Sequence, residues 1–452
     1  MSLAIEKIVF DFLLKHIDVK KPILIGLSGG PDSICLLHLL CEFQKQTNIE
    51  IHIAHVNHGW RLESAKELTV LEKLSERLGI FFHKAHFDPT KYSGNKENEA
   101  RKERYLFFCK IQKQINAQGI FLGHHKNDQA ETALKQIFEG VSLLFSYGMK
   151  QVSQFENLVI FRPLLDVKKK EILDFLKMKG FSYFVDETND DPKFLRGKMR
   201  TTILPFLSDR FGKDICDPLS FVSKEAQELW DYFSEKLVEK DVRVQMSDWG
   251  WFSDIHKARL GIVEIKFFLR KTAREFGIPL SHLQIEMAAN FLFNNVSNKY
   301  VHNSDKKLYI DRGRVFFLHA NPRILNQSSM SLQNTLQYGN WKVVVSEKLD
   351  QELQNHWQDV FLGKVHVIVP KGEYFLNTGE NSDLRKFLHG SSIKTKRYSR
   401  LLSEMKVPNI FVNAIPVISD VDGNILEDFL CGLKPQNSAP GHELCSIQLQ
   451  RI

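Results

Sequence analysis

Between residues 23 and 185 the chain alternates short apolar runs with stretches of helical periodicity, and this alternation restricts its fold more than any other feature. Parallel strands of one sheet need a crossover connection between them, usually a helix. The pattern therefore predicts an α/β fold with a doubly wound parallel sheet, which binds ligands beside the carboxyl ends of its strands. The expected strands lie at 23–27, 51–56, 80–87, 120–123, 158–165 and 181–185, and the expected helices include 33–43, 97–118 and 168–179.

The pattern changes near Pro205, and a length of 452 residues also indicates more than one domain. Residues 214–294 have mainly helical periodicity, residues 328–339 are polar, and short apolar runs typical of strands follow them. We expect an α/β domain at 1–213, a helical middle domain at 214–327, a polar linker, and a small mixed α/β domain at 340–452.

Composition excludes several classes of protein. Apolar residues make up 43% and charged residues 25% of the chain, and no apolar run is long enough to cross a bilayer. The first residues lack the layout of a cleavable signal, so we expect a cytoplasmic protein that does not enter a membrane. The cysteines form no Cys-x-x-Cys pair, which argues against a disulfide framework or a zinc site. They are Cys35, Cys41, Cys109, Cys216, Cys431 and Cys445.

A glycine loop carries the strongest chemical signal, because it follows an expected buried strand and opens an expected helix. It consists of Ser28, Gly29, Gly30, Pro31, Asp32 and Ser33. The glycines allow a tight turn and close approach of a phosphate, and the helix start offers unpaired N–H groups. The serines add hydroxyl donors, and Asp32 is suited to hold Mg²⁺ against phosphate oxygens. The alternative interpretation is a simple glycine turn capped by Asp32.

The sequence excludes two common kinds of phosphate-binding loop. The chain has no GxxxxGK[ST] loop for γ-phosphoryl transfer and no GxGxxG loop for a dinucleotide. Its loop resembles the PP-loop of the N-type ATP pyrophosphatases. The resemblance implies that ATP is bound by its pyrophosphate, that the α-phosphate is attacked, and that AMP is transferred.

Two further segments lie where the topology places ligands. His55 is near the end of the second strand, and the segment from His124 to Thr132 follows the fourth. Asp128 and Glu131 are three residues apart, so a helix presents both carboxylates on one face beside the histidines. A catalytic role is favoured by this position, whereas the alternatives are surface ion pairs or a satisfied pair of core histidines.

Together these segments resemble the tRNA(Ile)-lysidine synthetase family. The resemblance rests on the SGGxDS loop, HVNHGxR from His55, GHHxxDQxET from Gly123, RPLL from Arg162, and an acidic stretch at 186–190 before an arginine cluster. It is close over the first two hundred residues, which implies that the expected domain at 1–213 is the catalytic one, and looser around 391–416. The family implies an ATP-dependent ligase that adenylates C2 of the wobble cytidine in the CAU anticodon of tRNA(Ile) and joins it to free L-lysine.

The resemblance also implies roles for individual residues. The loop and His55 would bind ATP with Mg²⁺ on Asp32, and the catalytic residues would be Asp32, His124, Asp128 and Glu131. Either Asp128 or His124 would take the proton of the lysine ammonium, and Glu131 would orient the lysine. The expected tRNA contacts are Arg101, Arg104, Arg196, Arg200, Lys394, Lys396, Arg397 and Arg400. The last four lie in a basic run at 385–406, which could equally be a solvated face. A homodimer is left open.

Two other functions compete with this one. A tRNA sulfur transferase of the 2-thiocytidine type shares the loop and the RNA, but it needs a thiolate or a cluster held by paired cysteines. The scattered cysteines argue against it. An RNA-binding module without catalysis is the second, and the intact loop and His124–Thr132 segment argue against that.

Overall fold

A computed structural model describes most of the first 318 residues and shorter pieces of the remainder. The described residues are 4–57, 64–87, 96–185, 195–247, 249–303, 306–318, 329–331, 336–338, 341–346, 357–361, 364–370, 375–378, 402–404, 406–412, 416–419, 425–428 and 444–451. They form two compact units, Met1–Tyr232 and Phe233–Ile452. The three domains expected from the sequence stay a prediction.

The first unit is built on a six-stranded sheet in the order β3-β2-β1-β4-β6-β5. All neighbouring strands are parallel except β5 and β6, which are antiparallel. The strands are β1 (Ile23–Gly26), β2 (Ile51–Asn57), β3 (Phe81–His86), β4 (Ile120–Phe121), β5 (Val152–Phe155) and β6 (Leu158–Phe161). The predicted α/β class with a largely parallel sheet is confirmed.

One expected strand is wrong. Residues 181–185 form no strand, and β5, which we did not expect, lies at the edge of the sheet beyond β6. The tight β5–β6 turn places Glu156 in the left-handed region with a φ of 51°. Because this hairpin occupies the edge, residues 181–185 have no strand to pair with there. The Phe184 N–H instead donates to the Gly29 carbonyl in the glycine loop Ser28–Ser33, the expected phosphate loop.

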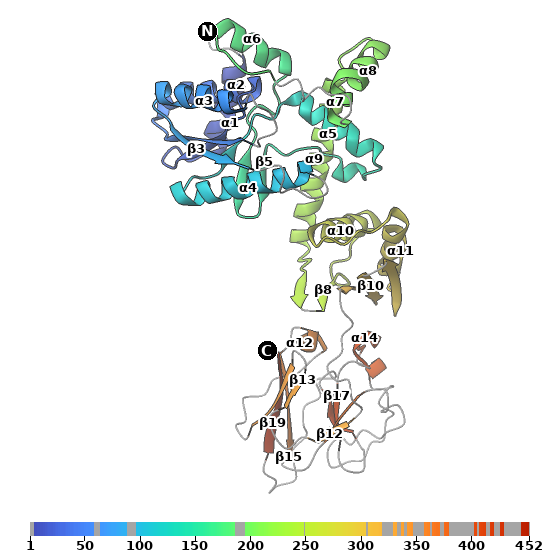
Figure 1. Cartoon of the computed structure of the whole chain (residues 1–452). Helices are drawn as coiled ribbons and strands as arrows, with labels where there is room; N and C mark the ends of the chain where they lie inside the picture. The colour runs from blue at the N-terminus through green and yellow to red at the C-terminus, as the bar shows by residue number, and fades with distance from the viewer. Residues whose placement is uncertain are drawn as a thin grey trace. The chain divides into compact units, whose positions relative to one another are not determined.

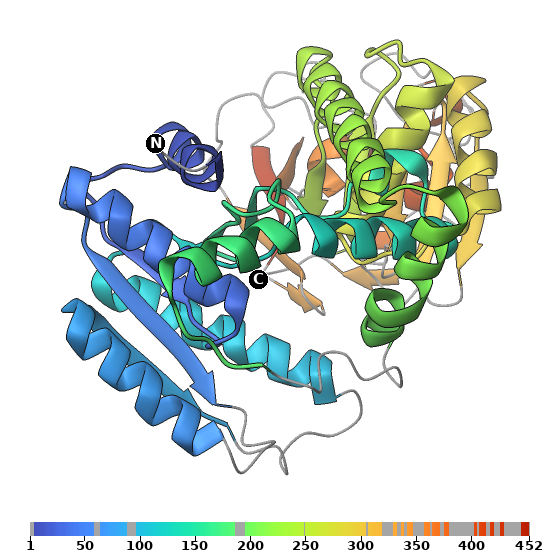
Figure 2. The same ribbon diagram turned by 90° about the horizontal axis from the view of Figure 1, so that it is seen from above.

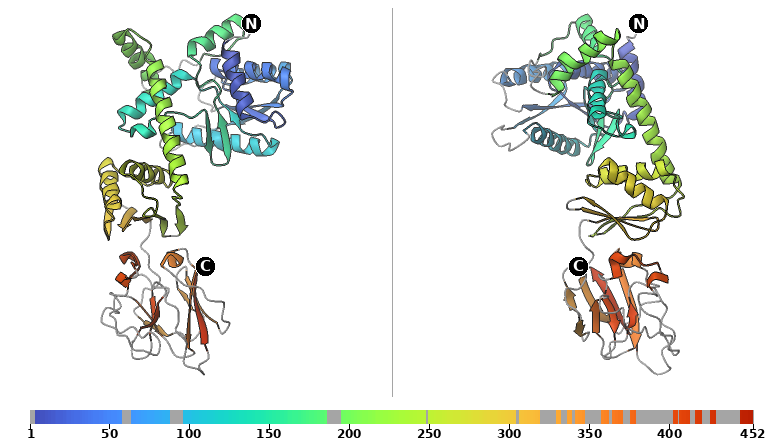
Figure 3. Two further views of the ribbon diagram at one scale, coloured as in Figure 1. Left: turned by 180° about the vertical axis from the view of Figure 1, so that it is seen from behind. Right: turned by 90° about the vertical axis from the view of Figure 1, so that its right-hand side faces the viewer.

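Helices cover both faces of this sheet (Figures 1 and 3). Strand residues alternate between the faces, so Ile23 and Ile25 of β1 pack with one group of helices and Leu24 packs with another. The first group is α1 (Ala4–His16), α2 (Pro31–Thr47), α3 (Ser64–Leu78) and α6 (Lys169–Lys179), and the second is α4 (Lys96–Ile115). On the first face α6 lies beside α2 (Figure 2), which brings its start close to the phosphate loop.

The remaining helices of this unit pack around α5 (Lys126–Phe138). Ala130 and Leu134 of α5 contact α8 (Leu204–Phe211) and the first turn of α9 (Cys216–Glu239). Before α8 come α7 (Leu195–Lys198) and one turn of π-helix, Met199–Ile203. Pro205 follows this turn and has no N–H to donate, so it interrupts the ordinary hydrogen-bond ladder. Single π turns of this kind occur frequently at functional sites, and this one contains Arg200.

The second unit begins with helices on an antiparallel sheet. The expected helices are present as α10 (Ile262–Glu275) and α11 (His282–Phe293), together with the end of α9. We did not expect the five-stranded sheet, in the order β7-β8-β11-β10-β9. Its strands are β7 (Gln245–Ser247), β8 (Gly250–Asp254), β9 (Lys299–Asn303), β10 (Lys306–Asp311) and β11 (Arg314–Leu318). Every residue of β11 is buried, so its sequence lacks the two-residue alternation of an exposed sheet.

The C-terminal pieces form two four-stranded sheets. Two of their strands, β12 (Ser329–Ser331) and β13 (Leu336–Tyr338), lie where we expected a linker. That expectation is wrong, because both strands find partners, β16 (Phe375–Thr378) and β14 (Trp341–Ser346). The other strands are β15 (Lys364–Pro370), β17 (Pro416–Ser419), β18 (Ile425–Asp428) and β19 (Leu444–Arg451). Within the described parts, no helix is both long and apolar enough to cross a membrane.

Candidate active site

The phosphate loop is held in shape by the hydroxyl of Ser33. Its Oγ accepts the backbone N–H groups of Ser28 at 3.2 Å and Gly29 at 3.1 Å, and it donates to the Gly30 carbonyl at 3.0 Å. Gly29 has a φ of 87°, which favours glycine, and an added Cβ would lie 2.7 Å from the Phe184 ring. The Ser33 hydroxyl therefore fixes the conformation of the loop. Ser28 lies at the open side of the loop, where the Ser28 Oγ accepts the Gly30 N–H.

Gly30 leaves open space at the start of α2. An added Cβ there would meet nothing closer than Ser28 Oγ at 3.5 Å. Gly30 is also the N-cap of α2, and no side chain caps the first turn. The helix start therefore keeps N–H groups directed at an open position, which is the arrangement that binds phosphate.

Neighbouring strands support the loop from both sides. His55 at the end of β2 donates from Nδ1 to the Leu27 carbonyl at 2.7 Å, and burial lowers the pKa of this histidine. Gly123 follows β4, and a Cβ on it would lie 2.9 Å from the Asp32 carbonyl carbon and 3.0 Å from Ser33 N. Glycine is required at this position because the segment after β4 passes against the backbone at the start of α2.

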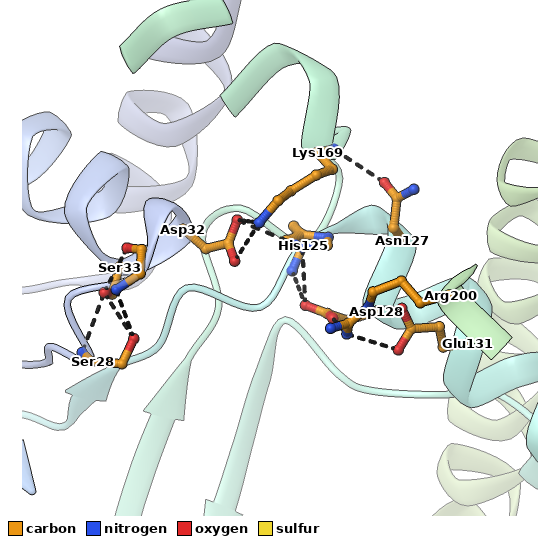
Figure 4. A network of polar contacts seen from close by, with 10 residues as sticks. Ser28, Asp32, Ser33, His125, Asn127, Asp128, Glu131, Lys169 and Arg200 are labelled. Atoms are coloured by element: carbon orange, nitrogen blue, oxygen red, sulfur yellow. Dashed lines mark hydrogen bonds and ion pairs between the residues drawn. The ribbon is translucent and has the colours of Figure 1, made fainter. Parts of the chain in front are cut away.

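A lysine that sequence reasoning missed lies on the predicted metal ligand. Lys169 Nζ is 2.6 Å from Asp32 Oδ1 and 2.9 Å from Oδ2 (Figure 4). The two residues are separated by 137 positions in the chain. Lys169 is the first residue of α6, in a run of three lysines, and nothing in that run distinguishes it from Lys168 or Lys170.

The start of α5 carries the acidic residues. Asp128 Oδ2 accepts the backbone N–H of His125 at 3.0 Å, which caps the helix. The imidazole of His125 is buried, and its Nε2 lies 3.6 Å from Asp32 Oδ1 and 3.6 Å from Asp128 Oδ2 (Figure 4). One ring nitrogen therefore lies between the phosphate loop and the acidic residues, which places the two parts of the site next to each other.

Arg200 joins the two carboxylates. Its Nε is 2.7 Å from Glu131 Oε1, and its Nη2 is 3.0 Å from Glu131 Oε2 and 3.1 Å from Asp128 Oδ1. We predicted that Arg200 contacts tRNA, and that role stays a prediction. In the structure its charge is directed at the acidic pair, an arrangement that the sequence spacing did not indicate.

The ionisation of these groups follows from burial and neighbouring charge. Burial lowers the pKa of His124 to about 3, so this imidazole is neutral at neutral pH. Burial raises the pKa of Glu131, against the opposing effect of Arg200. For Asp128, burial would raise the pKa, but His125, His124 and Arg200 together hold it below its usual range. Asp128 is therefore held in its anionic form.

Basic residues from distant segments surround His124. After burial, the positive charges that lower its pKa are Arg162, Arg101 and Arg196, which come from three different parts of the chain. Arg162 is buried and donates to the Lys150 carbonyl and to Ser153, so it is a structural residue. Arg101 and Arg196 are exposed. The fold thus brings two of the predicted tRNA contacts near His124.

Several predicted residues are not among those described. The later part of the HVNHGxR segment (His58 and Arg61) and the acidic stretch at 186–190 fall outside the described ranges, and so do Lys394, Lys396, Arg397 and Arg400. Arg104 lies on α4, half-buried, one turn from Arg101.

The donor set fits Mg²⁺ as a partner of a bound nucleotide. Among the described residues, no group of three or more histidine, cysteine or acidic side chains could hold a metal ion without help. Mg²⁺ commonly binds through one or two carboxylates together with substrate phosphates, and Asp32 offers one carboxylate beside the open loop. The site therefore fits a magnesium ion that arrives with its nucleotide.

Comparisons with known proteins identify the class. Residues 4–207 match the family model of the PP-loop domain. The fold and the glycine loop thus define a PP-loop enzyme that binds ATP.

Relatives of known name narrow the class to a family. The chain is 33% identical over 445 residues to tRNA(Ile)-lysidine synthase from Protochlamydia amoebophila, covering 98% of this chain and 96% of that one. It is 29% identical over 451 residues to the enzyme of the same name from Clostridioides difficile, covering 92% and 94%. The chain belongs to the tRNA(Ile)-lysidine synthase family and is a ligase, as predicted. Among solved structures, the U34-tRNA thiolase NcsA from Methanococcus maripaludis is 18% identical with a TM-score of 0.42, covering 50% of this chain and 79% of that one.

Proposed function

We propose that this chain adenylates C2 of the wobble cytidine in the CAU anticodon of tRNA(Ile) and joins it to free L-lysine, which gives lysidine and releases AMP and pyrophosphate. One observation carries the proposal. His125 Nε2 lies 3.6 Å from both Asp32 and Asp128, so a phosphate site and an acidic site adjoin. Adenylation and amine attack can then take place on one base without moving it between sites.

In the first step the C2 carbonyl oxygen attacks the α-phosphate of ATP. The bond between the α-phosphorus and the bridging oxygen breaks, and pyrophosphate leaves with the electron pair. The open backbone at Gly30 and the start of α2 hold phosphate oxygens. Mg²⁺ on Asp32 would supply charge compensation at those oxygens.

In the second step the ε-amine of lysine attacks C2, and AMP leaves. An ammonium is not a nucleophile, so a group of the chain must first accept its proton. We assign this role to Asp128 rather than to His124, because the pKa of Asp128 is held low and its negative charge attracts the lysine ammonium, whereas buried His124 is neutral. Glu131 positions Arg200 and, through it, Asp128.

His124 has a different part in this proposal. Its Nδ1 is buried and has no hydrogen-bond partner among the described residues. Buried polar atoms are nearly always paired in native proteins, so a polar group of the substrate is the expected partner. We propose that neutral His124 contacts the cytosine, while Arg101, Arg104 and Arg196 contact the RNA backbone. The basic run at 385–406 would bind the acceptor end of the tRNA.

The cysteines favour the ligase over a sulfur transferase. Among the described residues Cys35, Cys41, Cys109 and Cys216 are free thiols. Burial raises the pKa of each, to about 11 for Cys41 and about 12 for Cys216. Sulfur transfer needs a thiolate, which these surroundings disfavour. The cytoplasmic location stays a prediction, and the homodimer stays open.

The test is direct. Purified protein is mixed with ATP, Mg²⁺, labelled lysine and a transcript of tRNA(Ile) with a CAU anticodon, and label in the RNA is counted. We expect label in this tRNA, none in the methionine tRNA with the same anticodon, and release of AMP with pyrophosphate. Release of ADP, or labelling of both tRNAs, would reject the proposal.

A further inference from the structure

Lys169 is the residue of this site for which the sequence suggested no role. The phosphate loop, Ser28–Ser33, contains no lysine. The structure brings one to it from α6, where the Lys169 ammonium contacts both oxygens of Asp32. This cation is the only one that an ion pair places on Asp32 among the described lysines and arginines.

The backbone of Lys169 is fixed while its ammonium is accessible. Its N–H donates to Asn127 Oδ1 at 3.1 Å, and the nearby Lys126 N–H donates to the Val167 carbonyl at 2.9 Å. These bonds join the start of α6 to the start of α5. The side chain itself is 34% exposed, and four flexible carbons connect the ammonium to the anchored backbone. The ammonium can therefore exchange partners without movement of the helix.

Asp32 would hold a magnesium ion that arrives with a nucleotide, and this would require Lys169 to exchange partners. A divalent cation on Asp32 and an ammonium on the same two oxygens repel each other and compete for the same lone pairs. The new anion available to the ammonium would be the phosphate bound at the loop beside Asp32. Lys168 is not an alternative, because it pairs with Asp214 and Asp217.

We propose that Lys169 is a catalytic residue whose ammonium group moves from Asp32 to the pyrophosphate part of ATP. There it stabilises pyrophosphate as the leaving group. The inference rests on the proposed adenylyl transfer. As the bond to the α-phosphorus breaks, negative charge grows on the departing pyrophosphate, and a positioned cation stabilises that charge. In this role Lys169 donates hydrogen bonds and transfers no proton.

Binding measurements separate this role from a purely structural one. Calorimetry compares AMP with α,β-methylene-ATP, which carries the diphosphate but is not cleaved, both with Mg²⁺. For Lys169→Met we expect affinity for the methylene analogue to fall about 10- to 100-fold, as for a lost charge-assisted hydrogen bond, while AMP affinity is unchanged. Lys169→Arg should recover most of the loss. The exposed neighbour supplies a matched control, and Lys170→Met should bind both ligands as the natural chain does.

Three outcomes overturn the inference. Unchanged affinity of Lys169→Met for the methylene analogue rejects contact with the diphosphate. An equal fall for AMP and for the analogue shows that Lys169 only shapes the loop. If inorganic pyrophosphate competes with the analogue as well in Lys169→Met as in the natural chain, the inference is also rejected. If the natural chain binds the analogue through Lys169 but incorporates no lysine into tRNA, the proposed function is rejected and this inference is retained.

Discussion

The guanidinium of Arg200 binds both oxygens of the Glu131 carboxylate, with Nε 2.7 Å from Oε1 and Nη2 3.0 Å from Oε2. Glu131 is only 2% exposed. Burial of a carboxylate without a partner costs free energy, and a bidentate arginine–carboxylate pair is among the strongest hydrogen-bonded contacts between side chains. The π-helical turn before Pro205 is therefore coupled to the acidic face of α5.

Removal of this arginine should destabilise the fold. We expect Arg200→Met to lower the free energy of unfolding by about 3 kcal/mol, the lower end for a broken buried pair because Arg200 is partly exposed. The pKa of Glu131, already raised by burial, should rise further. A raised carboxyl pKa costs stability as pH rises through it, so the deficit should be larger near neutral pH than in mild acid. Urea unfolding at both pH values measures this, and Glu131→Gln in the same chain should recover part of the loss.

Asp128 should be required for turnover but not for folding. Asp128→Asn keeps the shape and an acceptor for the His125 N–H, so we expect a stability loss of no more than about 1 kcal/mol. Lysine incorporation should fall at least about 100-fold, as for loss of a general base. Asp166 is exposed and pairs only with Gln151 among the contacts found for it, so Asp166→Asn is the control. Retained incorporation in Asp128→Asn would remove this residue from the chemistry.

The two loop glycines should respond differently to alanine. Gly30 has a φ of −71° and room for a Cβ, so Gly30→Ala should change stability by no more than about 1 kcal/mol. The methyl group would occupy the open side of the loop, and ATP affinity should fall at least about 10-fold. Gly29→Ala should instead unfold at lower urea concentration, because its φ of 87° and the Phe184 ring exclude a Cβ. Tight nucleotide binding by Gly30→Ala would show that phosphate binds elsewhere.

RNA affinity should depend steeply on salt. Lysines and arginines that contact phosphates release counterions, so the logarithm of affinity should fall linearly with the logarithm of salt concentration. Arg101 and Arg196 are exposed near His124, and replacement of either by methionine should reduce the slope by about one. Filter binding across a salt series measures this. A slope that is flat for the natural chain, or that neither variant reduces, would contradict the assignment.

Acid should weaken the first unit partly through His38. This ring stacks on Phe181 with centroids 3.4 Å apart, and burial lowers its pKa to about 4, below the unfolded value of 6.5. Between these values the unfolded chain binds more protons, so stability is present above the unfolded pKa and is lost as pH falls towards 4. His38→Gln should reduce the pH dependence of the urea midpoint in this window. An unchanged dependence would assign the acid sensitivity to other histidines.

The sequence by itself determined the local features of this protein. These features are local patterns: the apolar runs, the glycine loop at a strand–helix junction, and the spacing of Asp128 and Glu131. They can be recognised because strands and helices have different residue periods. They were enough to predict the α/β class, the position of a glycine loop between a strand and a helix, and the family. The edge strand β5, the sheet of the second unit and the absent strand at 181–185 were missed, because pairing partners decide whether a short run becomes a strand.

Tertiary structure alone decided which charges meet. Lys169 reaches Asp32 across 137 positions and Arg200 reaches Glu131 across 69, and neither pair has a sequence spacing that predicts it. Tertiary structure also decides the ionisation of His124, because its low pKa comes from burial and from arginines of three separate segments. Contacts of this kind depend on how the helices pack against one sheet, and packing is a property of the whole unit that no local pattern contains.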